Sequence, residues 1–181
     1  LLQILGEQIL ERTKQRFNTS TGPDGQRWAP NAQATIMAML DRRRGIGKRG
    51  KITSKGVALA SSKRPLVDTG QLKNYSFSYR LVGDNEVEVS TNWRKSEIKG
   101  GAAIHQFGGH AGRGRKVTIP ARPFFPIYEN GTLYPSEADS IVASINQYLS
   151  ANLDSKSSGS AGGNTGSSIA QLNQLLSNRL G

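Results

Sequence analysis

Two runs of alternating apolar and polar residues in the middle of the chain place the tightest limit on its fold. Residues 75 to 82 alternate with a period of two, and residues 86 to 91 alternate again. A period of two is typical of a half-buried strand. Gly83, Asp84 and Asn85 lie between the runs and are turn-forming residues. The pattern therefore predicts an antiparallel hairpin, with two shorter strands over residues 102 to 107 and 116 to 119.

Helical periodicity occurs on both sides of this hairpin. Residues 1 to 17 carry an apolar stripe with a period near 3.6, and residues 137 to 153 carry another. Ser136 followed by Glu137 resembles a capping box at the start of the second helix. A third helix is predicted over roughly residues 31 to 43, with Asn31 as its N-cap.

The composition changes abruptly after residue 154. Residues 155 to 166 are almost entirely Ser, Gly, Ala and Asn, which is typical of a flexible linker. Residues 167 to 181 form a short amphipathic pattern that includes Ile169, Leu172 and Leu176. A helix of this length needs a receiving groove, on this chain or on a neighbouring copy, and we favour the neighbouring copy.

The charge is strongly basic and unevenly distributed. The 181 residues include 24 Lys and Arg against 13 Asp and Glu, a formal net charge of +11. Two Gly-rich segments, residues 41 to 64 and 94 to 122, hold most of the excess, and we interpret both as loops. Such loops either follow a phosphate backbone, meet an acidic protein surface or are merely solvated. The candidate contact residues are Arg42, Arg43, Arg44, Lys48, Arg49, Lys51, Lys55, Arg113, Arg115 and Lys116.

The sequence offers little that favours catalysis or a cofactor. It has no Cys, which excludes thiolate metal sites and cysteine nucleophiles. His105 and His110 are the two histidines, and their spacing matches no helical metal pair. Residues 1 to 10 are interrupted by polar side chains and fall short of the ~20 apolar residues of a membrane span. We therefore expect no enzyme activity, no metal or cofactor and no membrane partner.

Four short motifs follow one another along the chain. They are Arg16-Phe17, then Pro23-Asp24-Gly25 with Trp28 and Pro30, then Leu66-Val67-Asp68-Thr69-Gly70 with Leu72, then His105-Gln106-Phe107-Gly108 followed by Ile119-Pro120-Ala121-Arg122-Pro123-Phe124. In this order and spacing they resemble the phage virion morphogenesis family, which includes tail completion proteins of Mu-like and P2-like bacteriophages. The resemblance covers about residues 1 to 153.

The resemblance implies an α+β domain over residues 1 to 154. The basic segment 41 to 64, interpreted as a loop insertion, and the linker with its terminal helix depart from the family pattern. The fold of the domain would be a twisted antiparallel sheet with long hairpin loops, flanked by N-terminal and C-terminal helices. The resemblance also implies a structural virion protein, made in the host cytoplasm, that forms a ring of six or twelve copies at the head–tail junction. Expected neighbours are connector, tail terminator and tube proteins, and genomic DNA through non-specific phosphate contacts.

The motif residues have structural roles in this interpretation. Asp24 and Gly25 shape a turn that brings Trp28 over the core, and Asp68, Thr69 and Gly70 form a turn that launches the strand at Tyr75. Pro120 and Pro123 hold Arg122 in a rigid segment, where it either bonds local carbonyls or makes an inter-subunit salt bridge. His105 is expected to satisfy a backbone group at a strand end. Phe17, Phe107 and Gly108 complete the motif set.

The leading hypothesis is thus a neck subunit needed for head–tail joining. The alternative is a basic nucleic-acid-binding protein that acts in DNA packaging or regulation.

Overall fold

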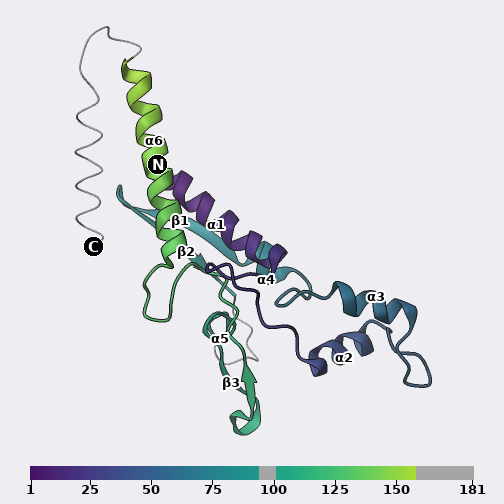
Figure 1. Cartoon of the computed structure of the whole chain (residues 1–181). Helices are drawn as coiled ribbons and strands as arrows, with labels where there is room; N and C mark the ends of the chain where they lie inside the picture. The colour runs from purple at the N-terminus through teal and green to yellow at the C-terminus, as the bar shows by residue number, and fades with distance from the viewer. Residues whose placement is uncertain (94–100, 158–181) are drawn as a thin grey trace. The chain divides into compact units, whose positions relative to one another are not determined.

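A computed structural model describes residues 1–93 and 101–157 of the chain. The chain divides into two compact units, Leu1–Ile141 and Val142–Gly181. The described residues combine helices with two separate two-stranded antiparallel sheets, so the fold class is α+β (Figure 1). The expectation of one twisted sheet is corrected to two small ones.

The predicted hairpin is confirmed, with a later start. Strand β1 (Phe77–Val82) pairs with β2 (Glu86–Thr91), and the register runs from Phe77 opposite Thr91 to Val82 opposite Glu86. Residues before the strand instead form the short helix α4 (Gln71–Tyr75), so Tyr75 lies outside the sheet. Gly70 has φ 81°, a conformation that glycine adopts without strain, and it begins this helical turn.

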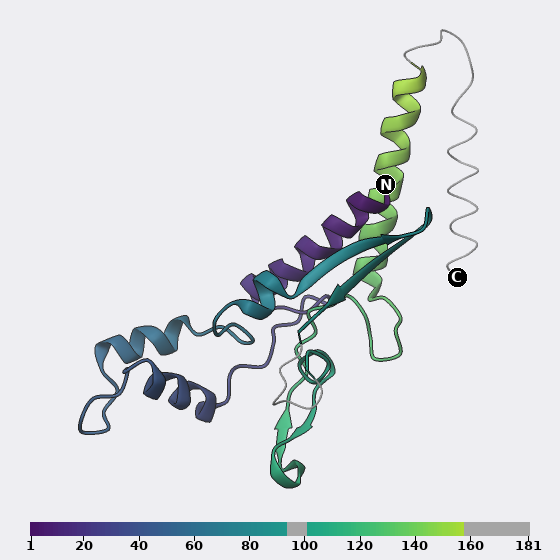
Figure 2. The same ribbon diagram turned by 180° about the vertical axis from the view of Figure 1, so that it is seen from behind.

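Helix α1 (Leu2–Thr19) lies along the β1–β2 hairpin in both views of the chain (Figures 1 and 2). The close approach depends on Gly6, because a Cβ there would lie 2.6 Å from Cδ2 of Tyr79 and 2.9 Å from Cγ2 of Val87. The Tyr79 hydroxyl donates a hydrogen bond of 2.9 Å to the Glu7 carboxylate at the same contact. The N-terminal helix and the hairpin thus pack as one layer on another.

An aromatic cluster forms the core next to this layer. Phe17 and Phe124 are fully buried, and their ring centroids lie 5.5 Å apart. Trp28 meets Phe17 edge to face at 5.3 Å, and Phe77 of β1 lies 5.7 Å from the same ring. Edge-to-face and tilted rings at these separations are favourable beyond the burial of their area. Leu72 belongs to the same cluster, so all four recognised motifs meet in the core.

The basic segment 41–64 is not a loop throughout. Helix α2 (Gln33–Arg42) leads into a tight hairpin with a bridge between Ile46 and Ile52, and helix α3 (Ser54–Ser62) follows. The Thr53 hydroxyl accepts from the Gly56 amide at 3.1 Å and so caps α3. We refer to α2, the hairpin and α3 together as the helical arm (Figure 2).

Two glycines allow the ends of the arm to meet. A Cβ on Gly56 would clash with the carbonyl oxygen of Gly45, so the backbones touch where α2 ends and α3 begins. The predicted cap of α2 is wrong, because Asn31 lies outside the helix and Ala32 precedes its first residue. The Asn31 amide instead donates to the Lys63 carbonyl at 3.4 Å.

The segment after residue 101 also departs from expectation. Residues predicted as a strand form helix α5 (Ala103–Phe107), and strand β3 (Gly109–Ala111) pairs instead with β4 (Val117–Ile119). A one-turn 3₁₀ helix, η1 (Arg113–Arg115), joins these strands. Gly108 has φ 78°, and a Cβ there would lie only 3.0 Å from Ala121 N, so a glycine ends α5 where the chain reverses into β3.

The last described helix is α6 (Pro135–Ser157), which continues past the expected start of the linker. The Ser136 hydroxyl donates to the Pro23 carbonyl at 2.7 Å, so it does not act as the predicted cap. Residues 158 to 181 lie outside the described residues, and with them the remainder of the linker and Ile169, Leu172 and Leu176.

A buried ion cluster joins α1 to the start of α6. Glu137 is 2% exposed, and its carboxylate accepts from Arg16 at 2.5 Å and from Nε of Arg12 at 2.7 Å. The second terminal nitrogen of Arg16 donates to the Phe124 carbonyl at 2.8 Å. Removing one member of a buried pair is costly because the other is left without a counter-charge.

We therefore expect Glu137→Ala to lower the free energy of unfolding by about 3–5 kcal/mol, since it leaves Arg16 buried and unpaired. Urea denaturation followed by circular dichroism measures the change. The control is Glu11→Ala, which removes an exposed partner of Lys14 on α1 and should cost less than about 1 kcal/mol. Equal losses in the two variants would contradict a stabilising role for the buried cluster.

Candidate functional site

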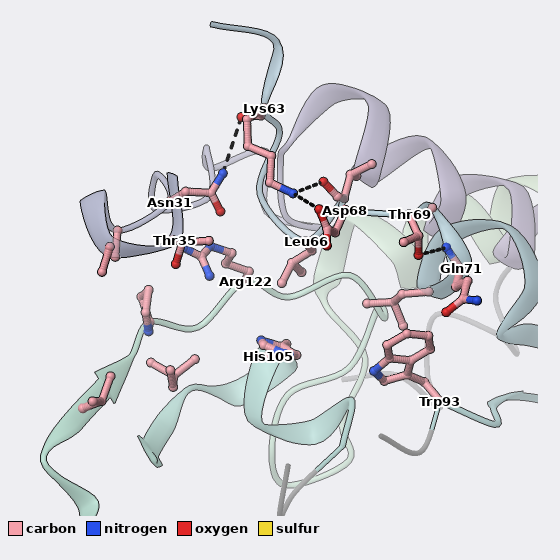
Figure 3. A pocket seen from close by; sticks show the side chains of 18 of the residues that line it. Asn31, Thr35, Lys63, Leu66, Asp68, Thr69, Gln71, Trp93, His105 and Arg122 are labelled. Carbon is pink, nitrogen blue, oxygen red and sulfur yellow. Dashed lines mark hydrogen bonds and ion pairs between the residues drawn. The ribbon is translucent and has the colours of Figure 1, made fainter. Parts of the chain in front are cut away.

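Two of the sequence motifs converge on one pocket. It has a volume of about 400 Å³ and lies among α2, residues 63 to 72, α5 and β4 (Figure 3). The motif residues that line it are Asp68, Thr69, Gly70, His105, Pro120 and Arg122. The two motifs lie far apart in the chain, and the fold brings their residues together. The sequence showed only the order in which the motifs occur. This pocket is the candidate functional site.

Arg122 fastens one wall of the pocket. Its Nε donates to the Ala29 carbonyl and its Nη2 to the Pro30 carbonyl, each at 2.8 Å. The Arg122 amide donates to the His105 carbonyl at 2.8 Å. The two carbonyls that the guanidinium binds belong to the segment before α2, and the one that the amide binds belongs to α5.

Asp68 is the acidic centre of the opposite wall. Its carboxylate lies 3.2 Å from Lys63, 3.2 Å from Arg42 and 3.4 Å from Arg43. Partial burial raises the pKa of Asp68, but the hydrogen bonds and charges of Lys63 and Arg42 outweigh it, and the net pKa is lowered. Three cations therefore share one carboxylate.

Thr69 and Gly70 begin a helix and not the predicted strand. The Thr69 hydroxyl accepts from the Gln71 amide at 3.4 Å, and Gly70 precedes α4. Leu66 next to this turn has φ 59°, which is strained for a branched side chain. The segment from Leu66 to Gly70 thus contains two residues with positive φ, and it forms part of the pocket wall.

His105 faces the pocket from α5, and not from a strand end as predicted (Figure 3). Its Nδ1 is buried and has no hydrogen-bond partner in the described structure. Burial lowers the pKa of His105, and the positive charge of Arg122 lowers it further, so the imidazole is neutral at pH 7. Phe107 and Gly108 follow at the end of α5.

The Pro-Asp-Gly motif forms its turn outside this pocket. The Asp24 carboxylate accepts from the Gln26 amide at 3.0 Å, and Gly25 has φ 77°. The Trp28 indole N–H donates to the Pro123 carbonyl at 3.0 Å and so joins this turn to the segment that carries Arg122.

The basic contact candidates divide into two groups. Arg42 and Arg43 bind Asp68, whereas Lys48 and Arg49 occupy the exposed turn of the helical arm, where Gly50 has φ 72°. We define the arm tip by its exposed cations, which are Arg44, Lys48, Arg49, Lys51 and Lys55. Arg113 and Lys116 are exposed near the turn between β3 and β4, and Arg115 lies in η1.

Sequence reasoning missed the role of Gln106. It is 4% exposed, and its amide group makes four hydrogen bonds to the main chain of residues 124 to 127. The donors and acceptor of a buried amide are thereby fully used. The position of this glutamine inside a recognised motif, between His105 and Phe107, was the available signal. Arg16 and Glu137 were also missed as partners, because 121 positions separate them.

Within residues 1–93 and 101–157, no group of three or more His, Asp or Glu side chains could hold a metal ion. Among the helices of those residues, none is long and apolar enough to cross a membrane.

Comparison with known proteins identifies the class to which this arrangement belongs. The profile of the phage virion morphogenesis family matches residues 1–150, and the chain belongs to this family. The chain is also similar to the Mu-like prophage FluMu G protein 2 of Haemophilus influenzae, with 45% identity over 90 residues. That alignment covers 47% of this chain and 51% of the relative, so the chain spans about half the relative's length. No solved structure is significantly similar to the chain.

The lowered pKa of Asp68 predicts a pH dependence of stability. A carboxylate with a depressed pKa in the folded state stabilises at neutral pH, and this contribution is lost as the pH falls through its ordinary value of 3.8 towards the folded pKa. Asp68→Asn should lower the free energy of unfolding by about 1 kcal/mol or less at pH 7, because the carboxylate is partly exposed.

The difference between wild type and Asp68→Asn should therefore shrink when urea denaturation is repeated from pH 7 down to pH 3. Asp41→Asn, which removes an exposed carboxylate from α2, is the control, and its difference should stay near zero at each pH. A wild-type advantage over Asp68→Asn that grows on acidification would contradict the assignment.

Proposed function

We propose that this protein is a tail completion or neck subunit of a tailed bacteriophage. In this proposal several copies, six or twelve, form a ring at the head–tail junction and are needed to join heads to tails. Its partners are the connector above and the tail terminator or tube proteins below. Family membership supports a virion structural role, and the ring and its position are the proposed refinement.

One observation carries the proposal: the motif residues use their polar groups to fasten the main chain. Arg16, Gln106 and Arg122 are buried and donate to backbone carbonyls of other segments. These side chains hold separate segments of the chain together. The arrangement supports a subunit that presents a rigid surface to other proteins.

The arm tip is the proposed contact for a polyanion. Arg42 and Arg43 are held against Asp68, whereas the cations of the arm tip are exposed at and around the turn. In a ring such turns would repeat around a channel and add their fields along the path of the DNA or against acidic neighbours. The alternative function, a free nucleic-acid-binding protein, uses the same residues without a ring.

Loss of the protein gives the direct test. A phage with a premature stop codon in this gene should accumulate mature heads and mature tails that stay separate in electron micrographs, because the joining subunit is absent. Expression of the wild-type chain in the host should restore joined particles. Normal virions without the protein would sink the proposal.

A salt titration separates the two candidate functions. The isolated subunit should not bind a short DNA duplex at ~150 mM salt, whereas a free DNA-binding protein would bind with an affinity that falls steeply with salt. Fluorescence anisotropy of labelled duplex measures this. Strong binding by the isolated chain would favour the alternative.

Within particles, the double variant Lys48→Ala and Arg49→Ala should lower the yield of joined virions by about tenfold, since two charged contacts are lost in each subunit. The matched control removes two positive charges elsewhere, Lys14→Ala with Arg27→Ala, and should retain most of the yield. Equal yields from the two double variants would contradict a contact role for the arm tip.

A further inference from the structure

We infer that the pocket among α2, residues 63 to 72, α5 and β4 is a docking site for an acidic peptide segment that carries a bulky apolar side chain. The segment would belong to a partner protein of the virion. That the partner is a virion protein rests on the proposed function. The chemical class of the ligand is argued from the pocket residues alone. Among the residues that line the pocket, the sequence analysis gave a contact role to Arg42 and, as one alternative, to Arg122, and it did not place them in a common site.

The walls of the pocket are mainly apolar. Leu66, Leu72 and Trp93 line one part of the cavity, and Val117 and Ile119 of β4 line another. Val117 is 53% exposed although it lines the cavity, so apolar surface is left uncovered in the described structure. A volume of about 400 Å³ lies within the ~300–1,000 Å³ range of sites that take an apolar group with a few polar contacts. These walls favour an occupant with a bulky apolar side chain.

The charge of the lining sets the sign of the partner. Arg42, Lys63 and Arg122 line the pocket with Asp68 as the acidic member. Asp68 is already bound by cations of this chain, including Arg43 from outside the lining. Positive charge therefore remains in excess, and a segment with carboxylates beside its apolar side chain is complementary.

His105 is a polar member of the pocket wall. Its Nδ1 atom is buried, closed to solvent and without a partner within the described residues. Leaving a buried polar atom unpaired is energetically costly. The strained backbone at Leu66 lies in the same wall, as is common where the chain is shaped for a contact.

A peptide fits this site better than DNA. A phosphate backbone is bound by a row of exposed cations, such as the arm tip offers. In the pocket, Lys63 and Arg122 are largely buried among apolar walls, a setting that suits a carboxylate beside an apolar side chain. The described pocket contains one indole ring, Trp93, among aliphatic side chains, and it lacks the row of stacking platforms that single strands need.

The test uses the full chain and a labelled nonapeptide with blocked ends, in which leucine lies at the centre of Asp and Glu residues. We expect saturable binding at ~150 mM salt by fluorescence anisotropy. A peptide with serine at the centre should bind about fivefold more weakly, because the apolar side chain is lost. A peptide with Lys in place of the acids should show no saturable binding.

Substitutions on one helix locate the binding. Ala34 and Ala38 are both exposed on α2, but Ala34 lines the pocket and Ala38 does not. Ala34→Glu should weaken binding of the leucine peptide about fivefold relative to Ala38→Glu, although the two variants change the net charge equally. Ala34→Lys should bind at least as well as wild type, which shows that the loss comes from charge and not from bulk.

The inference is overturned if the leucine peptide does not bind saturably, if leucine and serine peptides bind equally, or if Ala34→Glu and Ala38→Glu behave alike. Loss of binding in Ala34→Lys would also overturn it. These measurements use the isolated chain, whereas head–tail joining is scored in infected cells. If the peptide does not bind but phage without the protein accumulate separate heads and tails, the docking site is wrong and the proposed function stands. If the peptide binds as expected but virions without the protein are normal, the proposed function is wrong and the docking site stands.

Discussion

The guanidinium of Arg16 is the interaction on which the rest of the structure depends. One nitrogen binds the buried carboxylate of Glu137, and another binds the carbonyl of Phe124. The first bond joins α1 to the start of α6, and the second holds the segment whose phenyl ring fills the core beside Phe17. Because both bonds are buried, their geometry sets the positions of the aromatic side chains, and the aromatic core in turn supports the hairpin through Phe77.

Several elements could be predicted from the sequence because their signals are local. The hairpin has strict alternation and turn residues at its tip, and α1 has a long apolar stripe. The short helices could not be predicted in the same way. Helices α4 and α5 have five residues each, too few to show a helical period. Their bounds depend on a glycine that lies next to each helix. Gly70 begins the first, and Gly108 ends the second against the backbone at Ala121.

The sequence identified several residues of the candidate site but did not show that they lie together in one pocket. Asp68 and Arg122 were recognised from motifs, yet their partners lie on other elements, and sequence spacing carries no information about such distances. Arg122 binds carbonyls 92 and 93 positions away, and Glu137 binds an arginine 121 positions away. Glu137, which the sequence analysis placed only in the capping pattern at the start of its own helix, is thus the counter-ion of arginines on another helix, because tertiary contacts outweigh local preference.

The contact between Gly45 and Gly56 has a consequence for how the arm can diversify. Two backbones meet there without any side chain between them, so the crossing of the chain at the base of the turn is set by main-chain shape alone. The residues from Ile46 to Ile52 lie beyond this contact and form a separate turn, closed by the bridge between those two residues. Related chains could therefore exchange the charges or the length of this turn and adapt to a different neighbour, while the helices beneath keep their packing.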